Sequence, residues 1–201
     1  MSKLVCIDAG HGGVKPGAVG KILSGGKLQK LMEKDVVFEL DNEAIGGIGV
    51  ANRIGHHLRK AGLRTIMTRK SDENVDLAER ARIAVRNHAH LFVSVHCNSH
   101  TNPQANGIEV WAHPKDKRRA RLLARYILDD ILRQPECRGI VDRGIKTAQF
   151  RVLSGTYAHM PAVLIELPFI SNPVEAAMLA DRNFREAAGK TIAGAIRRFL
   201  I

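Results

Sequence analysis

The sequence contains few cysteines and few aromatic residues. It has 3 cysteines in 201 residues, Cys6, Cys97 and Cys137, and none of them belongs to a CxxC pair. This argues against a disulfide framework and against a zinc site built from thiolates, so we expect three reduced thiols. Aromatic residues make up 4% of the chain, and no nucleic-acid-binding motif is recognisable. Specific nucleic-acid recognition is therefore not expected, although basic charge alone can bind a phosphate backbone.

Long hydrophobic runs are also missing. No run approaches the roughly 18 apolar residues that a membrane-spanning helix needs, so no transmembrane segment is expected. The N-terminus, "MSKLVCIDAG", has one lysine and soon reaches an aspartate, which is not the pattern of a secretory signal. We therefore expect synthesis in the cytoplasm, where the protein stays unless something releases it. A chain whose leader had been removed would look the same.

Positive charge is in excess. Lysine and arginine number 31 against 20 acidic residues, which gives a net charge of +11. Such a surface attracts polyanions, and nucleic acid, an anionic membrane face and an acidic wall polymer all remain open. Only "DKRRARLLAR", residues 116–125, concentrates this charge. Its leucines at helical spacing favour a solvated helix face over a dedicated binding site.

Hydrophobic patterning predicts alternating strands and helices. A long irregular loop ending near residue 31 follows the first strand, and the helical pattern of residues 34–61 is interrupted by glycines at 45–49. We expect the last helical region, from Pro173, to split near Asp181. The six expected strands are residues 3–8, 64–69, 91–96, 107–113, 149–153 and 162–167. This order predicts one α/β domain with a mostly parallel six-stranded sheet flanked by helices on both faces.

Three reactive side chains follow strands of this sheet. His11 lies just past the first strand, His96 ends the third and Glu166 ends the sixth. In mostly parallel sheets, ligands gather at the carboxyl ends of the strands, so we expect these side chains to share one edge. "GHGG" lacks the patterns of phosphate-binding loops. His11 alone would more often be structural, but two imidazoles at one edge indicate a metal site.

Seven motifs in this order resemble the zinc-dependent N-acetylmuramoyl-L-alanine amidases of the amidase-3 type. The resemblance covers essentially the whole chain, and no single motif has to carry it. The motifs are "VCIDAGHGG", "LMEKDVVFEL", "TIMTR", "LFVSVHCNSH", "GIEVWA", "RGIKTAQFRVL" and "MPAVLIELPFISNPVEAAML".

The resemblance implies a twisted, mainly parallel sheet and a single catalytic domain over residues 1–201, without a separate wall-binding domain. It implies one Zn²⁺ per chain, held by His11, Glu33 and His96, with Glu166 as the catalytic carboxylate. The implied substrate is peptidoglycan, cut at the amide between the lactyl group of N-acetylmuramic acid and L-alanine. Zinc lowers the pKa of a water molecule toward about 7 and polarises a carbonyl, while a nearby carboxylate can carry the proton.

Local sequence alone does not single out Glu33. Asp35, Glu39 and Glu43 lie close to it, and a glutamate at a helix start can simply favour the helix dipole. Only the resemblance selects Glu33.

Other assignments around the implied site keep two interpretations each. Asp8 either orients a ligand imidazole or caps the turn, and Asn98 holds either substrate or its loop. Cys97 is interpreted as a small buried residue rather than a nucleophile. Glu166 could be a core carboxylate paired with an arginine, but an unpaired charge in "AVLIELPF" would be costly, which favours a catalytic role.

Three segments depart from the family pattern. Ala9 stands where proline is usual, which affects turn rigidity. Residues 41–50 form an extra segment, expected to be a bent helix or a loop bordering the cleft. "SGTYAH", residues 154–159, is slightly long and is expected to line the substrate groove.

Several functions are compatible with these residues. The first is a wall amidase, either a phage endolysin or a bacterial enzyme that acts on the wall or periplasm after release, with its positive charge holding it to anionic envelope polymers. The second is a metal-free module that binds wall fragments or nucleic acid. The third is a zinc peptidase acting on another amide. The complete set of ligand and base residues favours the first.

Overall fold

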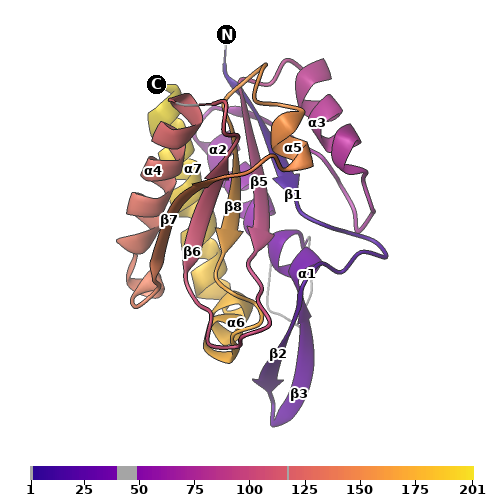
Figure 1. Cartoon of the computed structure of the whole chain (residues 1–201), viewed down its shortest axis with the longest axis vertical. Coiled ribbons are helices and arrows are strands. Elements are labelled where there is room, and N and C mark those ends of the chain that lie inside the picture. The colour runs from indigo at the N-terminus through magenta and orange to yellow at the C-terminus, as the bar shows by residue number, and fades with distance from the viewer. Residues whose placement is uncertain (1, 40–48, 117) are drawn as a thin grey trace.

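The computed structural model describes residues 2–39, 49–116 and 118–201, and it shows an α/β domain built on a central sheet (Figure 1). The six strands lie in the order β4-β1-β5-β8-β6-β7. Neighbouring strands are parallel except β6 and β8, which pair antiparallel. The predicted class is confirmed. The strands are β1 (Leu4–Ala9), β4 (Arg64–Met67), β5 (Leu91–Cys97), β6 (Ile108–Ala112), β7 (Asp142–Thr147) and β8 (Ala162–Leu167).

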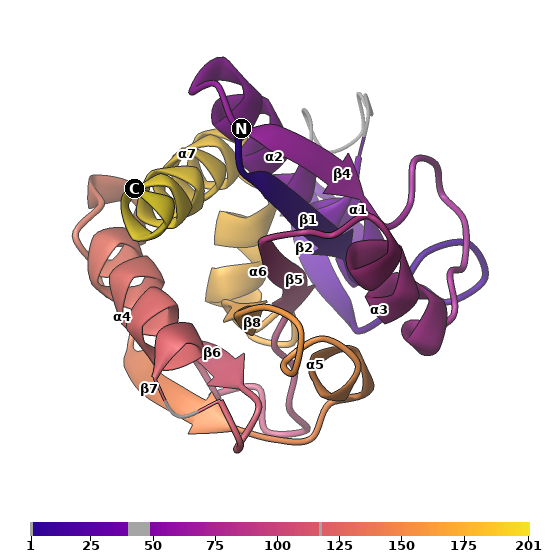
Figure 2. The same ribbon diagram turned by 90° about the horizontal axis from the view of Figure 1, so that it is seen from above.

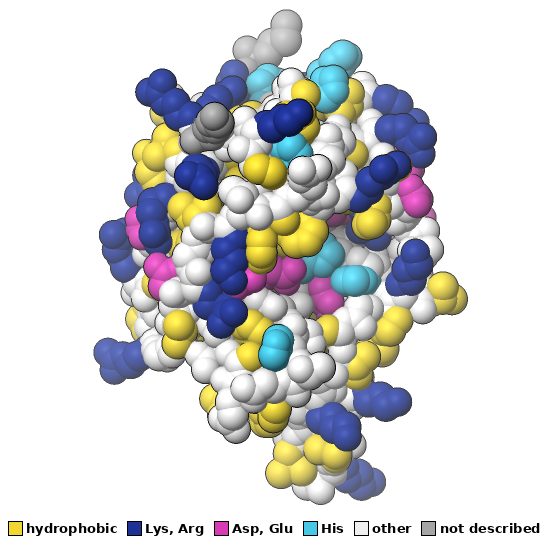
Figure 3. All heavy atoms as spheres, viewed as in Figure 1, with side chains coloured by type: hydrophobic (Ala, Val, Ile, Leu, Met, Phe, Trp, Pro, Cys, Tyr) yellow, Lys and Arg dark blue, Asp and Glu magenta, His cyan; other side chains and the backbone are white. Residues whose placement is uncertain are grey.

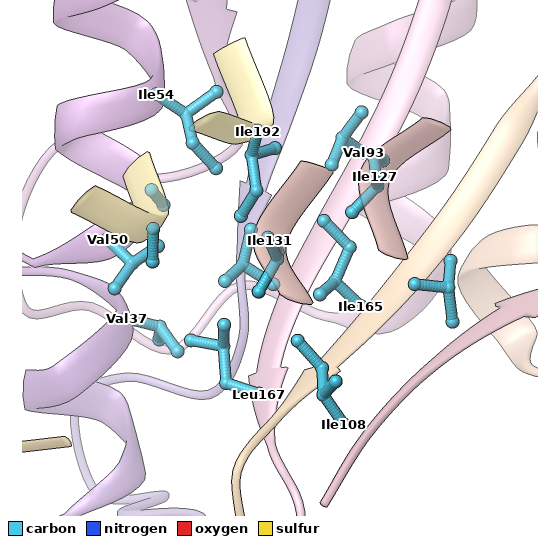
Figure 4. Packing of buried hydrophobic residues seen from close by; sticks show 14 of the residues in the cluster. Val37, Val50, Ile54, Val93, Ile108, Ile127, Ile131, Ile165, Leu167 and Ile192 are labelled. Carbon is cyan, nitrogen blue, oxygen red and sulfur yellow. The ribbon is translucent and has the colours of Figure 1, made fainter. Parts of the chain in front are cut away.

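Helices cover both faces of the sheet, as Figure 2 shows from above. One face carries α2, α4, α6 and α7, and the other carries α3 and α5. The larger core lies under the first group, where Ile54, Ile127 and Ile192 pack around the strand residues Val93 and Ile165 (Figure 4). The helices are α1 (Glu33–Val37), α2 (Val50–Lys60), α3 (Leu77–Arg86), α4 (Arg119–Leu132), α5 (Arg151–Ser154), α6 (Pro173–Ala180) and α7 (Arg182–Leu200), with a 3₁₀ turn, η1 (Pro135–Cys137).

The central strands are buried along their whole length, which explains their continuous apolar sequences. Every residue of β1 is buried, and β5 and β8 are buried except at His96 and Glu166, respectively, which are partly exposed. Strands covered on both faces lose the alternating pattern of half-exposed strands. His96 and Glu166 therefore mark the end of the sheet at which these strands reach solvent.

The loop predicted after β1 contains a β-hairpin. Strands β2 (Val19–Ser24) and β3 (Lys27–Met32) pair antiparallel and form a separate two-stranded sheet. Gly25 and Gly26 connect them with φ angles of 56° and 74°, as a tight hairpin turn requires. The prediction of an irregular loop in this region is therefore wrong. It failed because lysines and glycines obscure the alternating pattern of the two strands.

The fifth strand was predicted at the wrong place. Residues 151–153 belong to the short helix α5, which residues 149 and 150 precede, whereas the strand is the earlier segment β7. Val152 and Leu153 are buried against the second core, so their apolar run reflects burial in a helix. Strand β7 is an edge strand with exposed or half-buried residues, so it lacks a strand-like apolar pattern.

The helical region 34–61 divides into α1 and α2. The extra segment at 41–50 lies mostly outside the described residues, so its expected form stays a prediction. The C-terminal region splits at Asp181, as predicted, because the Asp181 side chain accepts a hydrogen bond from the Asn183 amide and starts α7. Among the described residues, no helix has the length and apolarity required to span a membrane.

Candidate metal and catalytic site

His11 occupies the turn that follows β1. Its φ of 57° lies in the left-handed region, which non-glycine residues adopt rarely and at an energetic cost. The turn is tied to the sheet by a hydrogen bond of 3.0 Å from the Gly10 amide to the Val95 carbonyl. The Arg80 guanidinium donates to the His11 carbonyl at 2.7 Å. Neighbouring elements thus hold His11 in an unfavourable backbone conformation. Such strain is typical of residues whose side chain is held in place for a function.

Glu33 begins α1 and is 3% exposed. Its Oε2 accepts from the Ala18 amide at 2.8 Å, and its Oε1 lies 3.1 Å from His11 Nε2 and 2.9 Å from His96 Nδ1. Burial alone would raise the pKa of Glu33, but the hydrogen bonds from the two imidazoles outweigh it and hold the pKa far below its usual range. Glu33 is therefore an ionised carboxylate directed at both histidines.

The three side chains form one cluster of possible metal ligands. One donor atom from each of His11, Glu33 and His96 lies within 4.8 Å of the others. The two imidazole rings are 5.1 Å apart in an edge-to-face arrangement. Two imidazoles and a carboxylate form a donor set that Zn²⁺ takes in hydrolases. The three residues therefore fit Zn²⁺, the metal that the family resemblance implies. Of the nearby acids, Asp35 and Glu39 are not part of the cluster, and Glu43 lies outside the described residues.

Two glycines allow this convergence. A Cβ on Gly10 would lie 2.4 Å from the His96 ring, and one on Gly17 would lie 2.5 Å from Glu33 Oε2. Both distances are shorter than real Cβ contacts. The glycine-rich turn thus brings the backbone close to the ligand side chains, rather than cradling a phosphate.

Glu166 lies beside this cluster, on the neighbouring strand. It stands opposite His96 on β5 and opposite Glu109 on β6. Its Oε2 is buried and has no partner among the described residues. Burial, with the negative charges of Glu33 and Glu109, raises the pKa of Glu166 to about 7, against the opposing effect of His96. The pairing with arginine considered for Glu166 is found instead at Glu109, which contacts Arg143 at 2.7 Å.

Asp8 acts on the His11 turn through an arginine. Its carboxylate is completely buried and accepts hydrogen bonds from Thr68 (2.5 Å), Ser94 (2.6 Å) and Arg80 (2.9 Å). Burial alone would raise the pKa of Asp8, but Arg80 and the two hydroxyls lower it below its usual value. Since Arg80 in turn binds the His11 carbonyl, Asp8 supports the turn without contacting a ligand imidazole.

Two buried arginines of the site were missed from the sequence. Arg80 projects from α3, and Arg69 follows β4 and donates to the carbonyls of Ala9, Gly10 and Lys34 at 3.0–3.2 Å. Arg69 ends the motif "TIMTR", which was a signal for it. No feature of the sequence distinguishes Arg80 from the exposed arginines of its helix.

Asn98 and Cys97 lie where β5 ends. Asn98 Oδ1 accepts from the Ser99 amide, while its backbone pairs with Leu167 and Ile170, so it holds its own loop, and its role in substrate binding stays a prediction. Its Nδ2 is buried and without a partner in the described part of the chain. Cys97 is buried, and burial raises the pKa of its thiol well above the usual value. All three cysteines are free and buried.

Residues 154–159 do not lie at the cluster. They precede β8, whereas His96 and Glu166 lie near the other ends of their strands. Tyr157 stacks on His113 at 3.8 Å, and His159 lines a hollow with Lys3 and His90. The expectation that this segment borders the substrate groove is therefore wrong.

The fold and the cluster define an α/β domain with a group of candidate metal ligands near the carboxyl ends of β1 and β5. The chain belongs to the N-acetylmuramoyl-L-alanine amidase family (Amidase_3), whose profile matches residues 5–198. Its class is therefore that of the peptidoglycan amidases.

Individual relatives are similar over most of this chain. It is 33% identical to protein YqiI of Bacillus subtilis, over 96% of this chain and 83% of that one. It is 35% identical to the endolysin of Bacillus phage SPP1, over 92% of this chain and 61% of that one. Its fold matches the amidase AmiC2 of Nostoc punctiforme with a TM-score of 0.81, 33% identity, and coverage of 98% and 97%.

Proposed function

We propose that this protein is a zinc-dependent amidase that hydrolyses the amide between the lactyl group of N-acetylmuramic acid and L-alanine in peptidoglycan. The observation that carries the proposal is the convergence of His11, Glu33 and His96 beside Glu166, whose buried Oε2 has no partner among the residues that the structure describes. Family membership supports the substrate class.

Each residue of the cluster has a distinct role in this proposal. His11, Glu33 and His96 would hold the ion, which when bound supplies Lewis acidity toward the scissile carbonyl and makes water easier to deprotonate. Glu166 accepts a proton from the attacking water on its carboxylate and donates it to the departing amine of L-alanine. Burial raises the pKa of Glu166 above its usual value, which makes the carboxylate a better proton acceptor near neutral pH.

The remaining residues position the reacting groups. Arg69 and Arg80 hold the backbone around His11 by hydrogen bonds to its carbonyls. Because buried arginines hold this backbone from inside the protein, the imidazole keeps its orientation when substrate arrives.

The decisive experiment combines metal analysis with product analysis. We expect about one zinc per chain, together with release from purified peptidoglycan of stem peptides that start with free L-alanine, and loss of release in a chelator. Zinc with cleavage of a different amide would reassign the substrate to that of a peptidase. Neither zinc nor cleavage would favour a metal-free binding module.

The location of action is part of the proposal. We propose that the protein acts on the wall or periplasm after release from the cytoplasm or removal of a leader, as a phage endolysin or a bacterial wall hydrolase. Its net charge of +11 would hold it to anionic envelope polymers. Retention on walls stripped of these polymers, at equal salt, would contradict the role of charge.

A further inference from the structure

The β2–β3 hairpin extends from the end of the sheet that carries the cluster (Figure 1). Alternate residues of a strand face the same side, so three cross-strand pairs share its outer face. Two of these pairs are apolar and the one between them is a pair of lysines. The pairs are Val19 with Met32, Lys21 with Lys30, and Leu23 with Leu28.

This outer face is strongly exposed. The exposed fractions are 75% for Leu23, 67% for Leu28 and 46% for Val19. Single exposed apolar residues are ordinary, but a group of them on one small sheet marks an interaction surface.

The opposite face of the hairpin is anchored in the protein. Ile22 and Leu31 are buried in the main core, and Gly20 lies so close to Ile170 that a Cβ would stand 2.0 Å from its carbonyl oxygen. At its base, the Ala18 amide and carbonyl both bond to Glu33. The hairpin therefore projects from the domain and is fixed on one face. No described residue packs over its outer face.

The charge of the hairpin is of one sign. Lys21, Lys27 and Lys30 are exposed, and no acidic residue occurs between residues 9 and 32. None of the three lysines has an acidic partner in the described part of the chain. Because Lys21 stands opposite Lys30, the two ammonium groups repel each other across the strands. An anionic partner would remove this repulsion.

We propose that this outer face binds the acidic stem peptides of a peptidoglycan strand next to the bond that is cut, an inference that rests on the proposed function. The lysines match free carboxylates of the peptides, while Leu23 and Leu28 match their alanine methyl groups. Figure 3 shows histidine and acidic side chains near the centre of the same view in which lysines and hydrophobic side chains cover the lower projection. A long polymer bound at the cluster can therefore extend along the hairpin.

The test compares two double variants with a matched control. Lys21→Glu/Lys30→Glu reverses the charge, and Leu23→Ser/Leu28→Ser removes the apolar contact. The control, Lys60→Glu/Lys190→Glu, reverses two other exposed lysines, both near His57. Sedimentation of each variant with insoluble peptidoglycan is measured in a chelator, so that binding is read without hydrolysis. KM and kcat are then measured on peptidoglycan and on a short muramoyl peptide.

We expect each hairpin variant to weaken sedimentation and raise KM on peptidoglycan by about tenfold, with kcat on the short peptide unchanged and the control like wild type. Unchanged sedimentation of both hairpin variants would overturn the proposal. If these variants sediment normally but lose binding to anionic vesicles, the proposal is also overturned, and the partner of the hairpin is a membrane. An equal loss on the short peptide would also overturn it, since the hairpin would then act through Glu33. Hairpin-dependent sedimentation without wild-type cleavage would support the hairpin surface and contradict the proposed activity.

Discussion

His96 and Glu166 lie opposite each other on adjacent parallel strands, β5 and β8. The register of the two strands therefore sets a candidate ligand beside a candidate proton acceptor. Glu33 also contacts His96, at 2.9 Å from its Nδ1, and comes from a separate element, α1. Binding and proton transfer are thus assigned to different carboxylates, and substitutions can separate them.

The first prediction concerns Glu166. Glu166→Gln keeps the shape of the side chain but cannot accept a proton, so we expect at least about a hundredfold loss in kcat. Zinc content should stay at the wild-type level, because Glu166 is not in the ligand cluster. Metal analysis and kinetics on the same preparation check both expectations, and near-normal turnover would contradict the assignment.

The second prediction concerns the pH dependence of the reaction. Burial raises the pKa of Glu166 to about 7, and in the proposed mechanism its ionised form is the base, so kcat/KM should rise with pH along an acid limb. Glu109→Gln removes a neighbouring negative charge and should move this limb to lower pH. Glu136→Gln, an exposed acid on η1, is the control and should leave it in place. An acid limb that stays at the same pH or moves to higher pH in Glu109→Gln would exclude an effect of Glu109 on the pKa of Glu166.

The third prediction concerns the buried pair of Asp8 and Arg80. Asp8→Asn leaves Arg80 buried without its countercharge and should cost about 3 kcal/mol at pH 7. The pKa of Asp8 is lowered in the folded state, so its contribution is present above the pKa of the unfolded chain and disappears as pH falls through the folded value. The difference between wild type and Asp8→Asn should therefore shrink in acid. Denaturant unfolding at several pH values measures it, and a difference independent of pH would refute the linkage.

The fourth prediction separates backbone strain from crowding of the site. Gly17 and Gly25 both have positive φ, at 71° and 56°, but only a Cβ on Gly17 would meet other atoms within 4 Å, among them Glu33 Oε2. Alanine at either position should cost about 1 kcal/mol through the left-handed conformation. Only Gly17→Ala should also weaken zinc binding, by roughly 10-fold or more, because it displaces a ligand. Competition titration with a zinc chelator distinguishes the two, and equal affinities would show that Glu33 adapts without loss.

The sequence predicted the elements whose pattern is local. Strands β1, β5 and β8 are buried on both faces and appear as apolar runs, and His11, His96 and Glu166 follow or end those runs. The selection of Glu33 came from resemblance to a family, because nearby acids have the same local pattern. The hairpin and β7 were missed, since a strand with exposed residues and lysines carries little hydrophobic signal.

By itself, the sequence determined the α/β class and which strand ends carry reactive side chains, because burial on a parallel sheet demands continuous apolar strands. Only the tertiary structure decided that Glu33 meets both histidines, that Arg80 pairs with Asp8 across 72 positions of the chain, and that one oxygen of Glu166 finds no partner within residues 2–39, 49–116 and 118–201. These relations depend on strand register and on close backbone approach at Gly10 and Gly17. Both arise from packing between segments far apart in the chain, which local sequence patterns do not encode.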